Sequence, residues 1–391
     1  MAGLGTTPSL ATMPTEIVCM IGDNMSSNEI KDWTLVSTRF RDILLPRICK
    51  HLKFSGNMEE LTNSLNAYFK RKKASFRHLA HHHTKFVTFE VTKFNSIFEM
   101  RAWVQRCGVD TIPIGRFLAD TPNLHGVVFD IWLPDPKEAF RFISFIRRGA
   151  DWHGPKHVYF KKYAEYWDIG KIVGKFKSGA LKGISLPLSS QLDHWGQIAR
   201  NGANLTSLCL GKYLCIYYRD SIMAAFNNQV ANTLAKDFPH LESLEIYDRF
   251  SRRDHPLYRG YTDSYRWCRE IAKAAFILTQ LRRLRRFAIS MCPLESNDIS
   301  INSITRQLLV ITEKEKDLGP REVHGPEGVS KLVTTYFAAR AKGLEEVCIT
   351  TDDPVNPVFY RETLTGDVWN ISKESFEDPS QKDLFPNVLR N

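Results

Sequence analysis

The sequence predicts an α/β protein in which three N-terminal helices precede an irregular α/β solenoid. Between residues 13 and 52, apolar residues recur three or four positions apart, as they do on one face of a helix. After residue 80, a short strand-like pattern recurs, with helix-like segments between its copies. The composition supports a packed core, because 43% of the residues are hydrophobic and 12% are aromatic.

The N-terminal stretch is expected to form three short helices. Pro14 suits the first turn of a helix, because that position needs no backbone donor. Ser26 and Glu29 have the spacing of a capping box at the start of a second helix. The apolar residues assigned to the second and third helices are Ile30, Trp33, Val36, Phe40, Ile43, Leu44, Ile48 and Leu52. Such a unit buries little surface alone, so it would gain stability by docking on another apolar surface.

The same residues resemble an F-box of the variety found in fungal proteins. The resemblance covers residues 10 to 54 and follows the order Met13-Pro14-x-Glu16-Ile17-x-x-x-Ile21, Ile30, Leu35-Val36-Ser37-x-Arg39-Phe40-Arg41 and Leu44-x-Pro46. Met13 stands where Leu is usual in the family. The resemblance implies that the helices bind a Skp-type adaptor and so join a cullin–RING ubiquitin ligase. It assigns the adaptor contacts to Pro14, Ile17, Ile21, Ile30, Val36, Phe40 and Leu44.

Eight copies of the pattern apolar-x-x-apolar-x-apolar follow residue 80. They begin at Phe86, Leu124, Pro155, Leu181, Leu205, Leu241, Leu284 and Leu344. Helix-like segments lie between later copies, at residues 221–236, 264–279 and 328–340. A strand and a helix at intervals are the signature of a leucine-rich-repeat solenoid, although a closed α/β domain is the alternative. The copies start 24 to 60 residues apart, so they carry insertions or are degenerate.

Residues between the consensus positions of each copy are expected to form the concave face of the solenoid. Side chains alternate along a strand, so the consensus residues face the core and their neighbours face the other way. That row mixes polar groups with Tyr, which suits protein recognition. The candidates for target binding are Asp130, Tyr159, Lys161, Glu245, Tyr247 and Arg286.

The predicted organisation has five parts. They are a flexible N-terminus at residues 1–9, the F-box at 10–54, a helical linker at 55–80, a leucine-rich-repeat-like region at 81–355 and an acidic tail at 356–391.

No motif of the sequence predicts catalysis, a cofactor or a metal. The patterns G-x-S-x-G, H-E-x-x-H and G-x-G-x-x-G do not occur. Residues 170–179 contain Gly and Lys without the spacing of a phosphate-binding loop. The histidines at 78 and 81–83 stand beside the basic run at 70–73 with no Cys or carboxylate near, so an exposed polar turn is expected there.

The net charge and the distribution of cysteines narrow the possible partners and the cellular compartment of the protein. The net charge is +10, with nine Lys or Arg against two Glu between Lys70 and Arg106, and five Lys or Arg against ten Asp or Glu between Ala341 and Asn391. A basic middle could favour acidic partners or nucleic acid, although a solvated face is the ordinary explanation.

The eight cysteines form no C-x-x-C pair and are expected to be reduced core residues. Without a signal peptide or spanning segment, a cytoplasmic or nuclear protein with no membrane partner is expected.

These inferences predict a substrate-recognition subunit of an SCF-type ubiquitin ligase, not an enzyme. The F-box would hold the Skp-type adaptor, the repeats would hold an unidentified target protein, and catalysis would belong to the assembly through proximity. The alternative is a repeat scaffold outside any ligase that binds an acidic partner or nucleic acid through its basic middle, with nucleic acid the less favoured of the two. A further alternative for the N-terminal helices is a cap that packs only on its own chain.

Overall fold

The protein has an α/β fold, as the sequence predicts. The computed structural model describes residues 12–25, 27–70, 80–91, 96–110, 112–131, 136–160, 169–187, 195–212, 228–248, 264–291, 325–341, 343–351, 358–365 and 368–375. The chain divides into two compact units. The first unit comprises Met1–Ile131 and Ser144–Pro155, and the second comprises Trp132–Ile143 and Lys156–Asn391.

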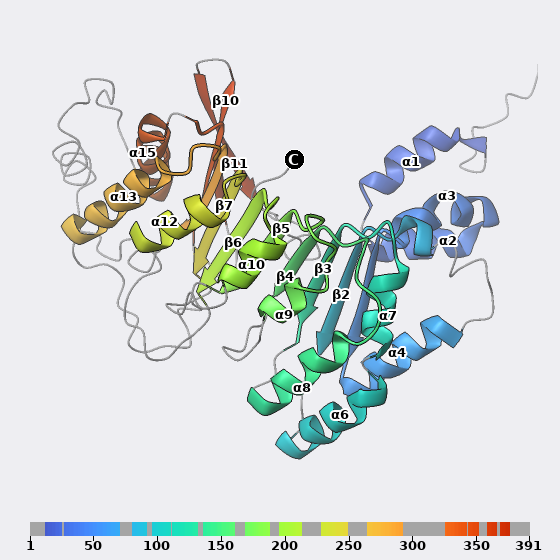
Figure 1. The fold of residues 1–391 in the computed structure, drawn as a ribbon. Coiled ribbons are helices and arrows are strands. Elements are labelled where there is room, and N and C mark those ends of the chain that lie inside the picture. The colour runs from blue at the N-terminus through green and yellow to red at the C-terminus, as the bar shows by residue number, and fades with distance from the viewer. Residues whose placement is uncertain are drawn as a thin grey trace, which may run out of the picture. The chain divides into compact units, whose positions relative to one another are not determined.

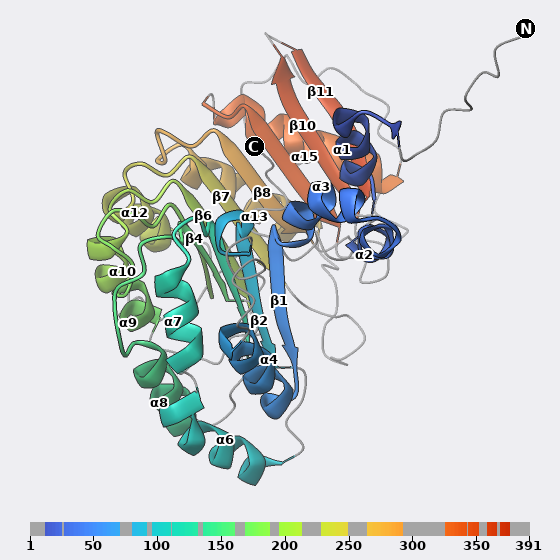
Figure 2. The same ribbon diagram turned by 90° about the vertical axis from the view of Figure 1, so that its right-hand side faces the viewer.

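The first unit combines helices with three parallel strands. Its elements are α1 (Thr15–Asp23), α2 (Ser27–Val36), α3 (Thr38–Ile48), β1 (His51–Gly56), α4 (Met58–Lys70), β2 (Phe86–Val91), α6 (Ile97–Asp110), α7 (Ile112–Asp120) and β3 (Gly126–Asp130), and α8 (Pro136–Ile146) crosses the boundary between the units along the chain. β1 pairs with β2, and β2 pairs with β3. α3 leads directly into the start of β1, and α4 packs beside β1 and β2 (Figure 2).

Aromatic side chains fill the space between the strands and helices of the first unit. The ring of Phe54 on β1 lies 5.8 Å from that of Phe89 on β2 and 5.4 Å from that of Phe117 on α7. Tyr68 on α4 lies 5.2 Å from the ring of Phe117, and Phe129 on β3 lies 6.0 Å from Phe89. Stacked and edge-to-face pairs of this kind stabilise a core beyond the area that they bury. This core therefore joins β1–β3 to α4 and α7.

The second unit alternates strands and helices. Its elements are β4 (His157–Phe160), α9 (Ile169–Val173), β5 (Gly183–Pro187), α10 (Trp195–Asn201), β6 (Ser207–Lys212), α12 (Asn228–Asp237), β7 (Ser243–Asp248), α13 (Ser264–Leu278), β8 (Arg286–Met291), α15 (Gly325–Arg340), β9 (Glu346–Thr351), β10 (Val358–Thr365) and β11 (Val368–Ser375). β4 to β9 pair in chain order and run parallel. Helices α9, α10, α12 and α13 follow one another along one side of these strands (Figure 1).

All eight predicted strands are present, as β2 to β9. Their consensus residues are buried, apart from the half-buried Phe86; Leu208, Leu244 and Phe287 are each 0% exposed. The turns before β4 to β9 are each linked to the next in the same way. For example, the amides of Thr206 and Ser207 both donate to the Lys182 carbonyl at 2.9 Å. Repetition of this linkage holds successive parallel strands in register.

Three details differ from the prediction. Phe40 lies on α3 and not on the second helix, because Ser37 is extended (φ −150°, ψ 140°) and ends α2 before it. Leu52 lies in β1 and not in the third helix, so the segments predicted as F-box and helical linker both contain part of a strand. Part of the expected acidic tail forms β10 and β11, where β10 pairs antiparallel with β9 and with β11. A count of charges does not reveal such pairing, because the backbone makes it and charged side chains of an antiparallel sheet can face water.

Candidate docking surface

Helices α1 to α3 have a small core of their own. Val18, Ile30, Phe40 and Leu44 are at most 6% exposed and pack against one another. Trp33 closes one side, with its ring 5.4 Å from that of Phe40. Met13, Met25, Trp33, Ile43 and Ile48 pack around this core and are partly buried. The unit therefore satisfies its inner apolar face without help from another protein.

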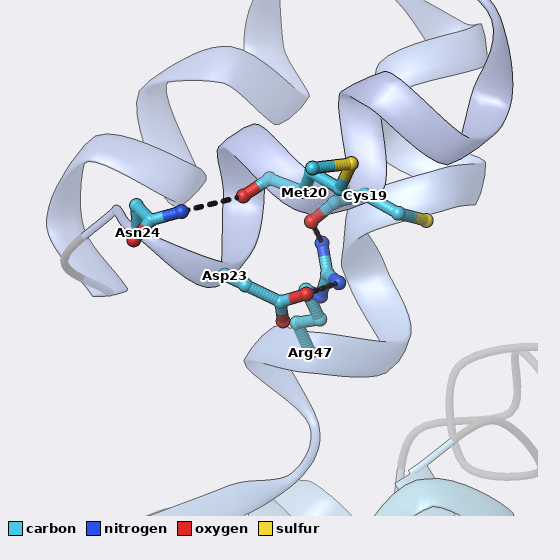
Figure 3. A network of polar contacts seen from close by, with 5 residues as sticks. All are labelled: Cys19, Met20, Asp23, Asn24 and Arg47. Atoms are coloured by element: carbon cyan, nitrogen blue, oxygen red, sulfur yellow. Dashed lines mark hydrogen bonds and ion pairs between the residues drawn. The ribbon is translucent and has the colours of Figure 1, made fainter.

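Two arginines of α3 hold the two ends of α1. Arg39 donates to the carbonyl of Met13, just before α1 begins. Arg47 donates to the carbonyl of Cys19, and its other terminal nitrogen lies 2.6 Å from Asp23 Oδ2 (Figure 3). A cation near the last turn of a helix also interacts favourably with the helix dipole. The side chain of Arg47 is only 22% exposed, whereas that of Asp23 is 66% exposed, so the carbonyl contact is the better shielded of the two.

Close packing seats the C-terminal end of α1 on α3. A Cβ atom on Gly22 would lie 2.6 Å from Leu44 Cδ2 and 2.6 Å from Arg47 Nη1. A side chain larger than hydrogen would therefore require the ends of the Leu44 and Arg47 side chains, or α1 itself, to move. Asn24 ends the helix and donates from Nδ2 to the Met20 carbonyl at 2.9 Å (Figure 3). These contacts determine which face of α1 points away from the core.

Apolar side chains remain exposed on α1 and α2. Ile17 and Met20 on α1 are 40% and 61% exposed, and Leu35 and Val36 at the end of α2 are 77% and 78% exposed. We call these four residues the exposed apolar set. They are half of the eight large hydrophobic residues that are exposed in the described part of the chain. Concentration of exposed apolar residues in one small unit is typical of a protein-interaction site.

The residues predicted to contact an adaptor fall into two groups. Pro14, Ile17 and Val36 are exposed, and Ile21 is half-buried. The others, Ile30, Phe40 and Leu44, belong to the buried core and offer no surface to a partner. Met20 was not among the predicted contacts. Its spacing of three residues from Ile17, on the same face of a helix, was the signal that could have identified it.

The residues predicted to bind a target lie in both units. Asp130 on β3 is 1% exposed and Tyr159 on β4 is 9% exposed, so neither presents its side chain to a target in this conformation. Glu245 is half-buried, and Arg286 Nε lies 3.8 Å from Glu346 Oε2 on the neighbouring strand. Tyr247 lies in β7, and Lys161 lies outside the described residues. The structure brings Arg286 and Glu346 together, which the one-strand pattern does not reveal.

Reactive groups are scarce in the described ranges. Among these residues, no group of three or more His, Cys, Asp or Glu side chains is arranged to hold a metal ion. Of the histidine run, His81 to His83 belong to the described residues and His78 does not. Burial raises the pKa of the Cys49 thiol to about 11, so this thiol is protonated and unreactive at neutral pH. No helix in the described ranges is both long enough and apolar enough to cross a membrane.

The chain matches no protein-family model and no curated protein.

Proposed function

We propose that this protein is the substrate-recognition subunit of an SCF-type ubiquitin ligase. Helices α1 to α3 would bind a Skp-type adaptor as an F-box does, and the strand–helix region would bind the target protein. The observation that carries the proposal is the exposed apolar set on a three-helix unit that already has its own core. The order of apolar and basic residues that resembles an F-box supports the same assignment.

The energetics favour a partner over a cap that packs only on its own chain. Fully burying an aliphatic side chain contributes roughly 1.5–3 kcal/mol. Ile17, Met20, Leu35 and Val36 are 40–78% exposed, so the fold leaves much of this contribution unused. A protein partner could recover it, less the cost of association. The two arginine contacts and the tight fit at Gly22 keep α1 in a fixed position, which reduces the ordering cost on binding.

The second unit supports an irregular leucine-rich-repeat-like solenoid as the finer description of the fold. Its parallel strands pair in chain order, its helices follow in one row, and its turns share one backbone linkage. The opposite strand face is not an open surface at every repeat, because Ser185 and Cys209 are both 0% exposed. Target recognition is therefore better assigned to the partly exposed Glu245 and Arg286 than to Asp130 or Tyr159.

The proposal can be tested by co-expressing the full chain with a Skp-type adaptor and measuring the adaptor that co-purifies. Ile17→Ser with Val36→Ser should abolish capture, because both side chains are exposed and belong to the set. Phe276→Ser is the matched control, since Phe276 is 61% exposed on α13 in the second unit. The control should retain the adaptor. Undiminished capture by the double variant would refute this function for α1 to α3.

A further inference from the structure

The strand starts of the first unit carry basic residues in register. The amides of Lys85 and Phe86 donate to the Lys50 carbonyl at 2.8 and 3.0 Å. The amides of His125 and Gly126 donate to the Lys85 carbonyl in the same way, at 2.6 and 2.9 Å. Neighbouring strands lie about 4.8 Å apart, so Lys50, Lys85 and His125 stand side by side where β1, β2 and β3 begin. We call these three residues the basic ladder.

The basic ladder keeps like charges together at the surface. Lys50 and His125 are exposed, and Lys85 is half-buried. Within the described ranges, neither Lys50 nor Lys85 forms an ion pair with a carboxylate. Like charges placed directly opposite one another destabilise a sheet. Lysines at adjacent positions are expected to repel each other, and no ion pair among the described residues offsets that repulsion.

The second unit shows that the fold does not require this arrangement. The equivalent positions before β7, β8 and β9 are Glu242, Arg285 and Glu345, whose charges alternate in sign. Arg285 Nη1 lies 3.6 Å from Glu345 Oε1. The same backbone linkage can thus carry neighbours that attract each other. The linkage therefore fixes no particular charge at these positions: Lys156 and Lys182, before β4 and β5, repeat the like pair of the first unit, whereas the positions before β7 to β9 alternate in sign.

We propose that the basic ladder binds an acidic segment of a partner protein, with Lys50 and Lys85 each contacting a carboxylate or phosphate. The three positions span roughly 10 Å across the strands. An extended chain covers that distance in about three residues. A segment with anionic groups two or three positions apart therefore matches the ladder. The inference stands independently of the adaptor role of α1 to α3.

A peptide fits the ladder better than a nucleic acid. Duplex-binding proteins commonly neutralise about six to ten phosphates, whereas the ladder has three basic groups. Proteins that bind single strands stack bases on exposed aromatic rings. Phe86, next to Lys85, is half-buried and packs edge-on against His51, with 6.5 Å between the ring centroids. Its ring is therefore only partly accessible to a base.

The test is fluorescence anisotropy of the full chain with a labelled hexaglutamate peptide. Lys50→Ser with Lys85→Ser should weaken binding about ten-fold, the loss expected for two charge contacts at exposed or partly exposed sites. Lys177→Ser with Lys236→Ser is the control of equal net charge, because both lysines are exposed in the second unit. It should change the affinity less than about two-fold. A peptide with two phosphoserines, if bound more tightly, would identify phosphate as the preferred anion.

Several results would overturn the proposal. They are absence of hexaglutamate binding by the unmodified chain, equal losses in the two double variants, or ladder-dependent binding of a short single-stranded oligonucleotide in preference to the peptide. Thermal melting separates binding from folding. The ladder variant should melt at the same or a slightly higher temperature, because it removes a repulsion. A clear fall would show that the lysines are structural. Capture of the adaptor should be unchanged, which keeps this test separate from that of the proposed function.

Discussion

The strand starts of β1–β2 and of β8–β9 share a backbone arrangement and differ in charge. In both, the amides of two consecutive residues donate to one carbonyl of the preceding turn: that of Lys50 in the first case and that of Arg285 in the second. Lys50 and Lys85 repel each other, whereas Arg285 pairs with Glu345. Backbone hydrogen bonds and the buried consensus residues hold the register in both places. The side chains at the strand starts can therefore form an ion pair in the second region and, as proposed, bind an anionic segment in the first.

The largest expected effect comes from the buried core of the second unit. Leu208→Ala should lower the free energy of unfolding by roughly 2–5 kcal/mol, because Leu208 is 0% exposed at a consensus position. Glu245→Ala, a half-buried polar position on the next strand, should cost less than about 1 kcal/mol. Urea denaturation of both variants measures the difference. Equal losses would show that the strand faces are assigned wrongly.

The second-largest expected effect concerns Cys49, the residue immediately before Lys50 in the first unit. The equivalent residue of the second unit, immediately before Arg285 and β8, is Leu284. Burial raises the pKa of Cys49 from 9.0 to about 11, so the unfolded chain ionises first. Stability is therefore full below pH 9 and falls between pH 9 and 11, by up to roughly 2–3 kcal/mol. Melting curves over this range should show a smaller fall for Cys49→Ala. An identical fall in both proteins would contradict the predicted contribution.

The third effect converts the attractive region into a repulsive one. Arg285→Glu would place three acidic residues in register, at 242, 285 and 345. The free energy of unfolding should decrease by about 1 kcal/mol, and added salt should restore part of it by screening. Arg285→Gln is the control, because it removes the attraction without adding repulsion. A salt-independent loss would show that packing, and not charge, explains the effect.

The smallest expected effect comes from the first unit, where a substitution converts a repulsive pair of side chains into an attractive one. Lys85→Glu should raise the free energy of unfolding by about 0.5 kcal/mol, because it replaces the repulsion with Lys50 by an attraction at a partly exposed site. The same variant should lose binding of the hexaglutamate peptide. Chemical denaturation and anisotropy together measure both changes. If Lys85→Glu lowered the free energy of unfolding and left binding of the peptide unchanged, the proposed difference between the strand starts of the two units would be wrong.

The strands were predicted correctly where buried apolar residues recur at a regular spacing in the sequence. The eight predicted strands have apolar residues at fixed offsets, and the structure buries all of them except the half-buried Phe86, as at Leu208 and Leu244. β1 was missed because Leu52 lies four residues after Ile48, a spacing that equally suits a helix. The pairing of β10 with β9 was missed because backbone groups make it, as between Phe359 and Thr350, and such pairing leaves no apolar pattern in the sequence.

The candidate docking residues could be predicted only as a group. Helical spacing identifies apolar residues on α1 to α3, but it does not separate the inner face from the outer one. Ile30 and Phe40 lie in the core, whereas Ile17 and Val36 face solvent. The separation depends on how three helices pack, and here the contacts of Arg39 and Arg47 with α1 contribute to it. Neither contact follows from local sequence, because the partners lie 26 and 28 positions apart.

The sequence by itself determined the α/β class, the helices at the N-terminus and the positions of eight strands. It could do so because residues that are buried in a regular element repeat with the period of that element. Only the tertiary structure decided which side chains become neighbours across strands. Lys50 and Lys85 stand side by side, and Arg285 meets Glu345, because parallel pairing sets a register that no single strand contains. The basic ladder and the exposed apolar set are both products of that register and of helix packing.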